Sequence, residues 1–174
     1  MKTLNLLLIN LLTLPFCYSQ NSYDLEEGKP FVMNGIEYGY EIRNESKKGI
    51  KKEEFNKFEV RAFVTNKSGC TKLMFPRQTL LLGLDYQDVM AEFDCINATG
   101  KRLTLKSAKV KAREFNAPYV YTSKDANGKD FRNNVQVKVG NMLKNGETIY
   151  NNFTVILQDG ERPIMRVRII ETVE

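Results

Sequence analysis

From residue 36 onward, apolar and polar residues alternate along the chain in short runs that are separated by turn residues. In residues 36–43 every second residue is apolar and the residues between them are charged apart from Gly39, which places one row of side chains on each face of an extended strand. A period of two predicts a β-strand, with one face in a core and the other in water. Almost no stretch shows the period of a helix.

The same alternation predicts further strands, at residues 57–66, 71–75, 89–97, 105–114, 119–122, 133–139, 148–157 and 164–172. Asn34-Gly35 after residues 31–33 indicates a tight turn, and residues 125–128 indicate a hairpin between two of the strands. The charged residues 47–54 are predicted to form a solvated loop or a single helical turn. Short strands at this spacing favour one antiparallel β-sandwich over residues 36–174, with an eight-stranded up-and-down barrel as the alternative.

The first residues have the pattern of a secretory signal peptide. Lys2 precedes an apolar run over residues 4–14, which is too short for a membrane span, and Ser19 supplies the small residue that a signal peptidase prefers. We therefore expect residues 1–19 to be removed, leaving an exported chain with no transmembrane span. Residues 20–35 then form an N-terminal segment with a possible hairpin arm. Lipidation of Cys17 is the alternative, although the preceding Phe16 is larger than lipoprotein sites prefer.

Composition narrows the function classes further. The chain contains no histidine, which removes serine and cysteine triads, the imidazole base and every metal site with an imidazole ligand. The sequence therefore predicts a protein that is not an enzyme and that has no cofactor and no metal. Loss of Lys2 with the signal lowers the net charge from +5 to +4, a modest value that does not favour nucleic acid as a partner.

Two cysteines, Cys70 and Cys95, remain after removal of the signal peptide. Because an exported chain meets an oxidising environment, we expect a disulfide between them. By closing a loop it would stabilise the folded state by about 3 kcal/mol. Two separate thiols that behave as small apolar residues are the alternative.

Charged residues recur on two predicted strands. The acidic residues Asp85, Asp88, Glu92 and Asp94 could serve acid–base chemistry, but alternation predicts that Glu92 and Asp94 lie on a solvated face. Basic residues form the most pronounced row, which consists of Lys106, Lys109, Lys111 and Arg113. Such a row could bind an anionic glycan or lipid headgroup, with an affinity that falls as salt rises.

Tyrosines alternate in two pairs, Tyr38 with Tyr40 and Tyr119 with Tyr121. At strand spacing we predict that these side chains are half-buried in the core. A face that stacks on carbohydrate is the alternative.

Two turn motifs carry a resemblance to known domains. The strand at residues 58–65 runs into Asn66-Lys67-Ser68-Gly69, and Asn145-Gly146-Glu147 precedes a late strand. These features resemble exported immunoglobulin-like β-sandwich domains of bacteria, and the Tyr-Ser-Gln end of the signal, with 16 asparagines in the chain, looks like exported proteins of the Bacteroidota. The resemblance implies an immunoglobulin-like fold and an exported protein that is periplasmic, outer-membrane-associated or extracellular. It assigns no functional residue.

These observations lead to two functional hypotheses. The first is a non-enzymatic protein-interaction module, an accessory subunit of a cell-envelope or outer-membrane assembly that binds an envelope protein. The second is a module that binds an anionic glycan or lipid through the basic row.

Overall fold

The computed structural model describes residues 22–50, 53–79, 83–85 and 87–170. The predicted signal peptide and Cys17 lie outside these residues. The strands are β1 (Ser22–Leu25), β2 (Phe31–Met33), β3 (Ile36–Ile50), β4 (Glu53–Asn66), β5 (Lys72–Met74), β6 (Arg77–Thr79), β7 (Gly83–Asp85), β8 (Val89–Ile96), β9 (Ala108–Lys111), β10 (Arg113–Lys124), β11 (Asp130–Leu143), β12 (Thr148–Gln158) and β13 (Ile164–Ile169).

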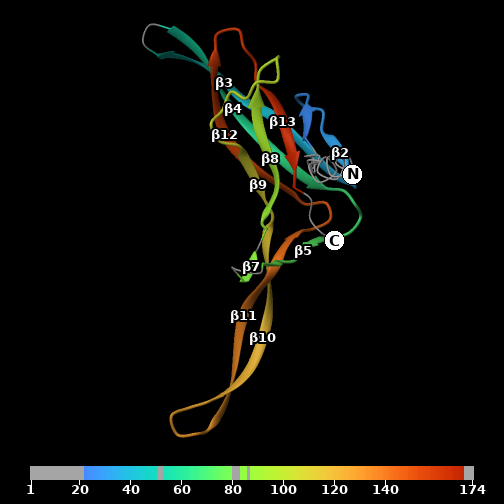
Figure 1. Cartoon of the computed structure of the whole chain (residues 1–174), viewed down its shortest axis with the longest axis vertical. Coiled ribbons are helices and arrows are strands. Elements are labelled where there is room, and N and C mark those ends of the chain that lie inside the picture. The colour runs from blue at the N-terminus through green and yellow to red at the C-terminus, as the bar shows by residue number, and fades with distance from the viewer. Residues whose placement is uncertain (1–21, 51–52, 80–82, 86, 171–174) are drawn as a thin grey trace, which may run out of the picture.

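Two four-stranded antiparallel sheets form the body of the molecule (Figure 1). The first sheet has the strand order β1-β13-β8-β9, and the second has the order β12-β4-β3-β2. The N-terminal segment contributes to both, because β1 pairs with β13 and β2 pairs with β3. None of the described sheets closes into a barrel, so the sandwich prediction is confirmed and the barrel alternative is not.

The core lies between the two sheets and consists of the inward rows that alternation predicts. Val60, Ala62 and Val64 of β4 face Ala91 and Phe93 of β8 across a single buried cluster, and all five side chains are at most 1% exposed. Tyr38 and Tyr40 belong to this cluster, as predicted. Burial raises the pKa of Tyr38 to about 12.

The predicted turn at Asn34-Gly35 joins β2 to β3. Asn34 and Gly35 have positive φ angles of 52° and 74°, the pair of left-handed conformations that a two-residue hairpin of this kind requires. Asparagine and glycine adopt them at the lowest cost.

Within the charged stretch, residues 47–50 and 53–54 are strand residues and not the loop or helical turn that their charge suggested, while residues 51–52 lie outside the described residues. The ladder between β3 and β4 continues through them, from Lys47 opposite Asn56 to Ile50 opposite Glu53. Lys47 lies between two carboxylates, 3.4 Å from Glu54 and 2.9 Å from Asp159. Backbone pairing with a neighbouring strand and cross-strand charge pairs therefore outweighed the lack of apolar residues.

A long hairpin formed by β10 and β11 leaves the sandwich and extends well beyond it (Figure 1). We define residues 116–138 of this hairpin as the arm. The base of the hairpin lies inside the body, where Ala112 is 8% and Leu143 is 0% exposed. At this base β11 also pairs with β5, over Asn141–Leu143 and Lys72–Met74.

Two buried asparagines hold the base of the hairpin in place. The Asn66 side-chain amide donates to the carbonyl oxygens of Leu143, at 2.9 Å, and Cys70, at 2.8 Å. Asn141 donates to the carbonyl of Gln87 at 2.9 Å. Since both asparagines are at most 1% exposed, these bonds satisfy side-chain amide N–H groups that water cannot reach.

Gly140 permits the close approach of β5 to β11. A Cβ atom at this position would overlap the carbonyl oxygen of Met74.

In the part of the chain that the structure describes, no helix is long and apolar enough to cross a membrane.

Candidate functional site

The arm is a regular two-stranded ribbon. Each residue of β10 from Asn116 to Lys124 has a partner on β11 between Lys138 and Asp130, with a bulge beside Phe115. Opposed residues of an antiparallel pair lie on the same face, so the register shows which side chains gather together.

One face of the arm is apolar and the other is polar. The first, which we call the apolar face, contains Ala117, Tyr119, Tyr121, Phe131, Val135 and Val137. Its other two positions are Ser123 and Asn133, whose side chains hydrogen-bond to each other at 2.7 Å. The opposite face carries mostly polar and charged side chains, among them Thr122, Arg132 and Gln136.

No second layer covers the apolar face among the described residues. The five large side chains on it remain substantially exposed: Tyr119 57%, Tyr121 42%, Phe131 46%, Val135 38% and Val137 44%. The rings of Tyr119 and Tyr121 stack at a centroid distance of 6.0 Å. Exposed apolar side chains gathered on one face of this kind often mark a binding surface.

The free end of the arm is a self-contained turn. Asp125 Oδ1 accepts hydrogen bonds from the backbone N–H groups of Asn127 and Lys129, both at 2.9 Å. Gly128 takes a positive φ of 80°. The carboxylate therefore shapes the turn, as the residue pattern at 125–128 predicted.

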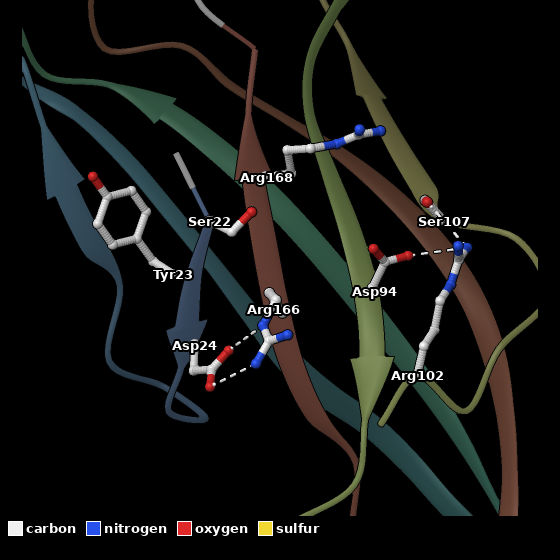
Figure 2. A pocket seen from close by; sticks show the side chains of 8 residues that line it. All are labelled: Ser22, Tyr23, Asp24, Asp94, Arg102, Ser107, Arg166 and Arg168. Carbon is white, nitrogen blue, oxygen red and sulfur yellow. Dashed lines mark hydrogen bonds and ion pairs between the residues drawn. The ribbon is translucent and has the colours of Figure 1, made fainter. Parts of the chain in front are cut away.

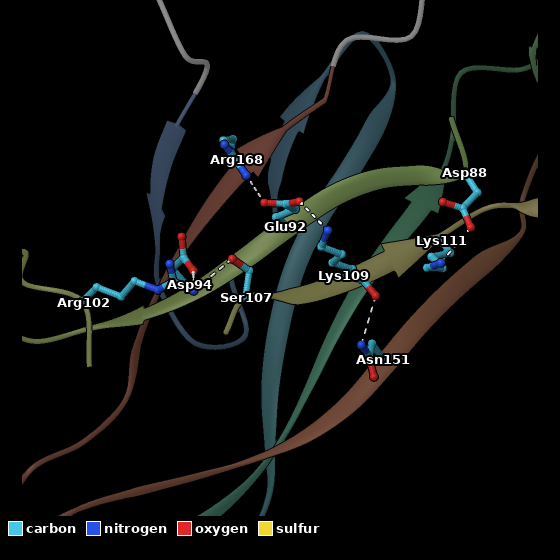
Figure 3. Close-up of polar contacts among 9 residues, drawn as sticks. All are labelled: Asp88, Glu92, Asp94, Arg102, Ser107, Lys109, Lys111, Asn151 and Arg168. Carbon is cyan, nitrogen blue, oxygen red and sulfur yellow. Dashed lines mark hydrogen bonds and ion pairs between the residues drawn. The ribbon is translucent and has the colours of Figure 1, made fainter. Parts of the chain in front are cut away.

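Three of the four residues of the predicted basic row are already paired with carboxylates, and Figure 3 shows two of these pairs. Lys109 lies 3.3 Å from Glu92 and Lys111 lies 2.8 Å from Asp88. Arg113 is 2.6 Å from Glu147, whereas Lys106 is exposed in the loop before β9. An anionic ligand would have to compete with these carboxylates, so the row offers less charge than the sequence suggests.

Glu92 lies on the outer face of the first sheet, as alternation predicts, but it is not solvated there. Its side chain is only 9% exposed because Lys109 on β9 and Arg168 on β13 close over it from the two neighbouring strands. Burial raises the pKa of Glu92, but hydrogen bonds from Arg168 and Lys109 outweigh this effect and hold it below its usual range. Glu92 is thus a structural anion and not a free acid.

A shallow hollow lies on the outer face of the first sheet, beside Arg168 (Figure 2). It has a volume of about 580 Å³, and its walls include Arg102, Arg166 and Arg168. The first two guanidinium groups each meet a carboxylate, Arg102 at 3.0 Å from Asp94 and Arg166 at 2.6 Å from Asp24. Arg168 pairs with Glu92 in the same way, so the three guanidinium groups of the hollow are neutralised by carboxylates of the chain itself.

The predicted disulfide is wrong: Cys70 and Cys95 are both free thiols. Cys70 lies near Asn66 and Leu143, at the end of the sandwich where β8 begins, whereas Cys95 lies toward the end of β8. The eight residue-to-residue steps from Gln87 to Cys95 span about 26 Å in extended form, far beyond the separation of about 7 Å that a bridge tolerates. Burial raises the pKa of Cys95 to about 11.

Other chemistry finds no support at the candidate residues. Asp88, Glu92 and Asp94 each pair with a cation and do not converge. Within the described ranges no three acidic or cysteine side chains gather where they could hold a metal ion.

Comparison of the chain with known protein families, with curated proteins and with solved structures finds no match. The function must therefore be argued from the residues themselves.

Sequence reasoning missed the apolar face as a unit. The sequence predicts that Tyr119 and Tyr121 are half-buried in the core. They are about half-buried, but on the arm, and neither belongs to the core cluster. Alternation reveals that a strand has an apolar face, but it does not reveal whether anything covers that face. The length of the hairpin between residues 113 and 143 was the available signal.

Proposed function

We propose that this chain is an exported, non-enzymatic module that binds a protein partner through the apolar face of the arm. The signal peptide pattern at residues 1–19 supports export, and we place the partner in a cell-envelope or outer-membrane assembly, of which this chain would be an accessory subunit. One observation carries the proposal: an amphipathic hairpin stands outside the sandwich, and no described segment covers its apolar side.

The position of the apolar side chains supports binding over folding stability. Their contacts in the described structure are with each other and with the opposite strand of the arm. Exposed aromatic side chains are common anchors of protein interfaces because they bury a large area at a low cost in conformational entropy. Tyrosine adds a hydroxyl group that can hydrogen-bond at the rim.

A paired set of variants tests the proposal. The binding variant carries Tyr119→Ser, Tyr121→Ser and Val135→Thr on the apolar face, and the control variant carries Asn116→Ser, Val120→Thr and Thr122→Ser on the opposite face. Each tagged protein is used to capture partners from gently solubilised cell envelopes at low and high salt. We expect a stoichiometric protein that the wild type and the control retain at high salt, because apolar contacts are not screened.

Loss of that protein from the apolar-face variant alone is the supporting result. Equal capture by all three proteins would contradict the proposal. A ligand that high salt releases, and that is lost with Lys106→Ala and Lys109→Ala, would instead support binding of an anionic glycan or lipid by the basic row.

A further inference from the structure

The outer edge of β11 is open along the arm. β5 pairs with β11 only over Asn141–Leu143, and Pro76, which cannot donate to a ladder, follows shortly after β5 ends. Beyond that point β10 is the only described strand beside β11. The arm therefore continues past the end of β5 with one edge exposed along its length.

The other edge of the arm, on β10, is protected. Pro118 lies within β10, which is the edge strand of its sheet, and it lacks a backbone N–H. Proline on an edge strand is a common device against pairing with another chain. β11 has no proline, so the two edges differ in their capacity to accept a strand.

The register shows which backbone groups of β11 point outward. The N–H of Asp125 donates to the carbonyl of Lys129 at 3.0 Å, which makes this a hydrogen-bonded pair. Because the two kinds of pair alternate, Pro118 opposite Gln136 is a non-hydrogen-bonded pair, in agreement with the missing donor of proline. The N–H groups of Arg132, Asn134 and Gln136 therefore point to the open edge.

We propose that an extended segment of the partner protein adds as a strand to the open edge of β11, over residues 132–138, in line with β5. This inference rests on the proposed function and specifies how the partner is held. The added strand would lay every second side chain beside Val135 and Val137, which widens the apolar face from two strands to three. Backbone hydrogen bonds supply affinity in this mode, and the alternate side chains supply specificity.

Charge indicates the composition of the segment. Lys124, Lys129 and Arg132 gather at the free end of the arm against two acids, and Asp125 already accepts two hydrogen bonds from its own turn. The free end is thus net positive. We infer a partner segment in which apolar and polar residues alternate and acidic residues lie toward the end of the arm.

A phage-displayed library of twelve-residue peptides, selected on the mature wild-type chain, is the probe. Enrichment of alternating apolar residues with acidic residues is the expected result. Binding of a selected peptide is then measured by fluorescence anisotropy for Gln136→Pro, which removes an outward N–H, and for Gln136→Ala, which keeps it. We expect Gln136→Pro to weaken binding at least about tenfold and Gln136→Ala to leave it within about twofold.

Two controls separate strand addition from misfolding. Pro118 already occupies the opposite position of the same pair, so the register tolerates a proline there, and Pro118→Ala should leave binding unchanged because it alters only the β10 edge. In the wild type, bound peptide should slow hydrogen exchange at Arg132, Asn134 and Gln136. This measurement needs no variant.

Several outcomes would overturn the inference: no enriched alternation, no protection of these amides, or equal binding by Gln136→Pro. Binding of the free chain to vesicles that contain anionic lipid, or a concentration-dependent dimer lost with Gln136→Pro, would assign the edge to a membrane or to a second copy. If the apolar-face variant loses its partner while Gln136→Pro keeps it, the proposed function stands and only strand addition fails.

Discussion

The sandwich body and the arm share the same alternation of apolar and polar residues, but the apolar side chains are buried in the body and exposed in the arm. In β4 the alternating residues Val60, Ala62 and Val64 are at most 1% exposed, whereas Val135 and Val137 of the arm are 38% and 44% exposed. The difference lies in what faces each strand. A second sheet covers the apolar side of β4, whereas none of the described sheets covers the arm. Alternation thus shows that a strand has an apolar face, but whether that face is buried depends on which other strands pack against it.

The same contrast extends to charge. On the first sheet, acids and bases from neighbouring strands neutralise each other, as Glu92 does with Lys109 and Arg168. At the free end of the arm, basic side chains outnumber acidic ones by three to two. The body therefore satisfies its own groups, while the arm offers unsatisfied apolar surface, backbone edge and charge together.

Truncation of a core side chain should have the largest effect on stability. Phe58 is 1% exposed between the sheets, so Phe58→Ala removes buried surface and leaves a cavity. We expect the free energy of unfolding to fall by about 3–5 kcal/mol in urea denaturation. Tyr119→Ala, as the matched change on the arm, should lower it by no more than about 0.5 kcal/mol. Similar losses for the two variants would contradict the contrast between body and arm.

Removal of the buried carboxylate should have a smaller, pH-dependent effect. Glu92→Gln leaves Lys109 and Arg168 without their anion, and we expect a loss of about 1–3 kcal/mol at pH 7. Because the pKa of Glu92 is lowered in the folded state, its contribution is complete above its ordinary value of 4.5 and is lost as the pH falls through the lowered pKa.

Urea denaturation of both proteins from pH 7 to pH 3 measures this dependence, and the two curves should converge in acid. Glu26→Gln, which breaks an exposed pair with Lys29, is the control and should change stability little. A constant difference between wild type and Glu92→Gln at every pH would show that the carboxylate does not act through its charge.

Excision of the arm should leave the body almost unchanged. Residues 118–136 can be replaced by Asn-Gly, which closes the hairpin between Ala117 and Val137, a hydrogen-bonded pair. Few contacts link the removed residues to the sandwich, so we expect the free energy of unfolding to shift by less than about 1 kcal/mol. Thermal unfolding followed by circular dichroism measures the shift. Loss of cooperative unfolding would show instead that the arm supports the core.

The smallest effect is expected at the exposed thiol. Cys70→Ser should change stability by less than about 0.5 kcal/mol because Cys70 is exposed in a turn and forms no bridge. In the native mature chain a thiol reagent should label Cys70 alone, since burial shields Cys95 and raises its pKa to about 11. Mass spectrometry before and after unfolding counts the labels. A native mass lower by two hydrogens, with no label, would restore the disulfide.

The sequence by itself determined the all-β class, the inward rows of the sandwich and the turns at Asn34-Gly35 and at residues 125–128. These features depend on side-chain period and on local backbone preference, which are properties of neighbouring residues. The sequence also contained the basic row, but not the carboxylates of other strands that neutralise it.

Only the tertiary structure decided which apolar faces are covered, which charges meet and how far apart the two thiols lie. Residues 47–50 and 53–54 became strand residues because β3 and β4 pair with each other, and Glu92 became buried because two cations from flanking strands close over it. Each of these outcomes depends on residues distant in the sequence. The arm shows this dependence most plainly, since its amphipathic pattern matches that of a core hairpin and only the absence of an opposing layer among the described strands makes it a candidate binding surface.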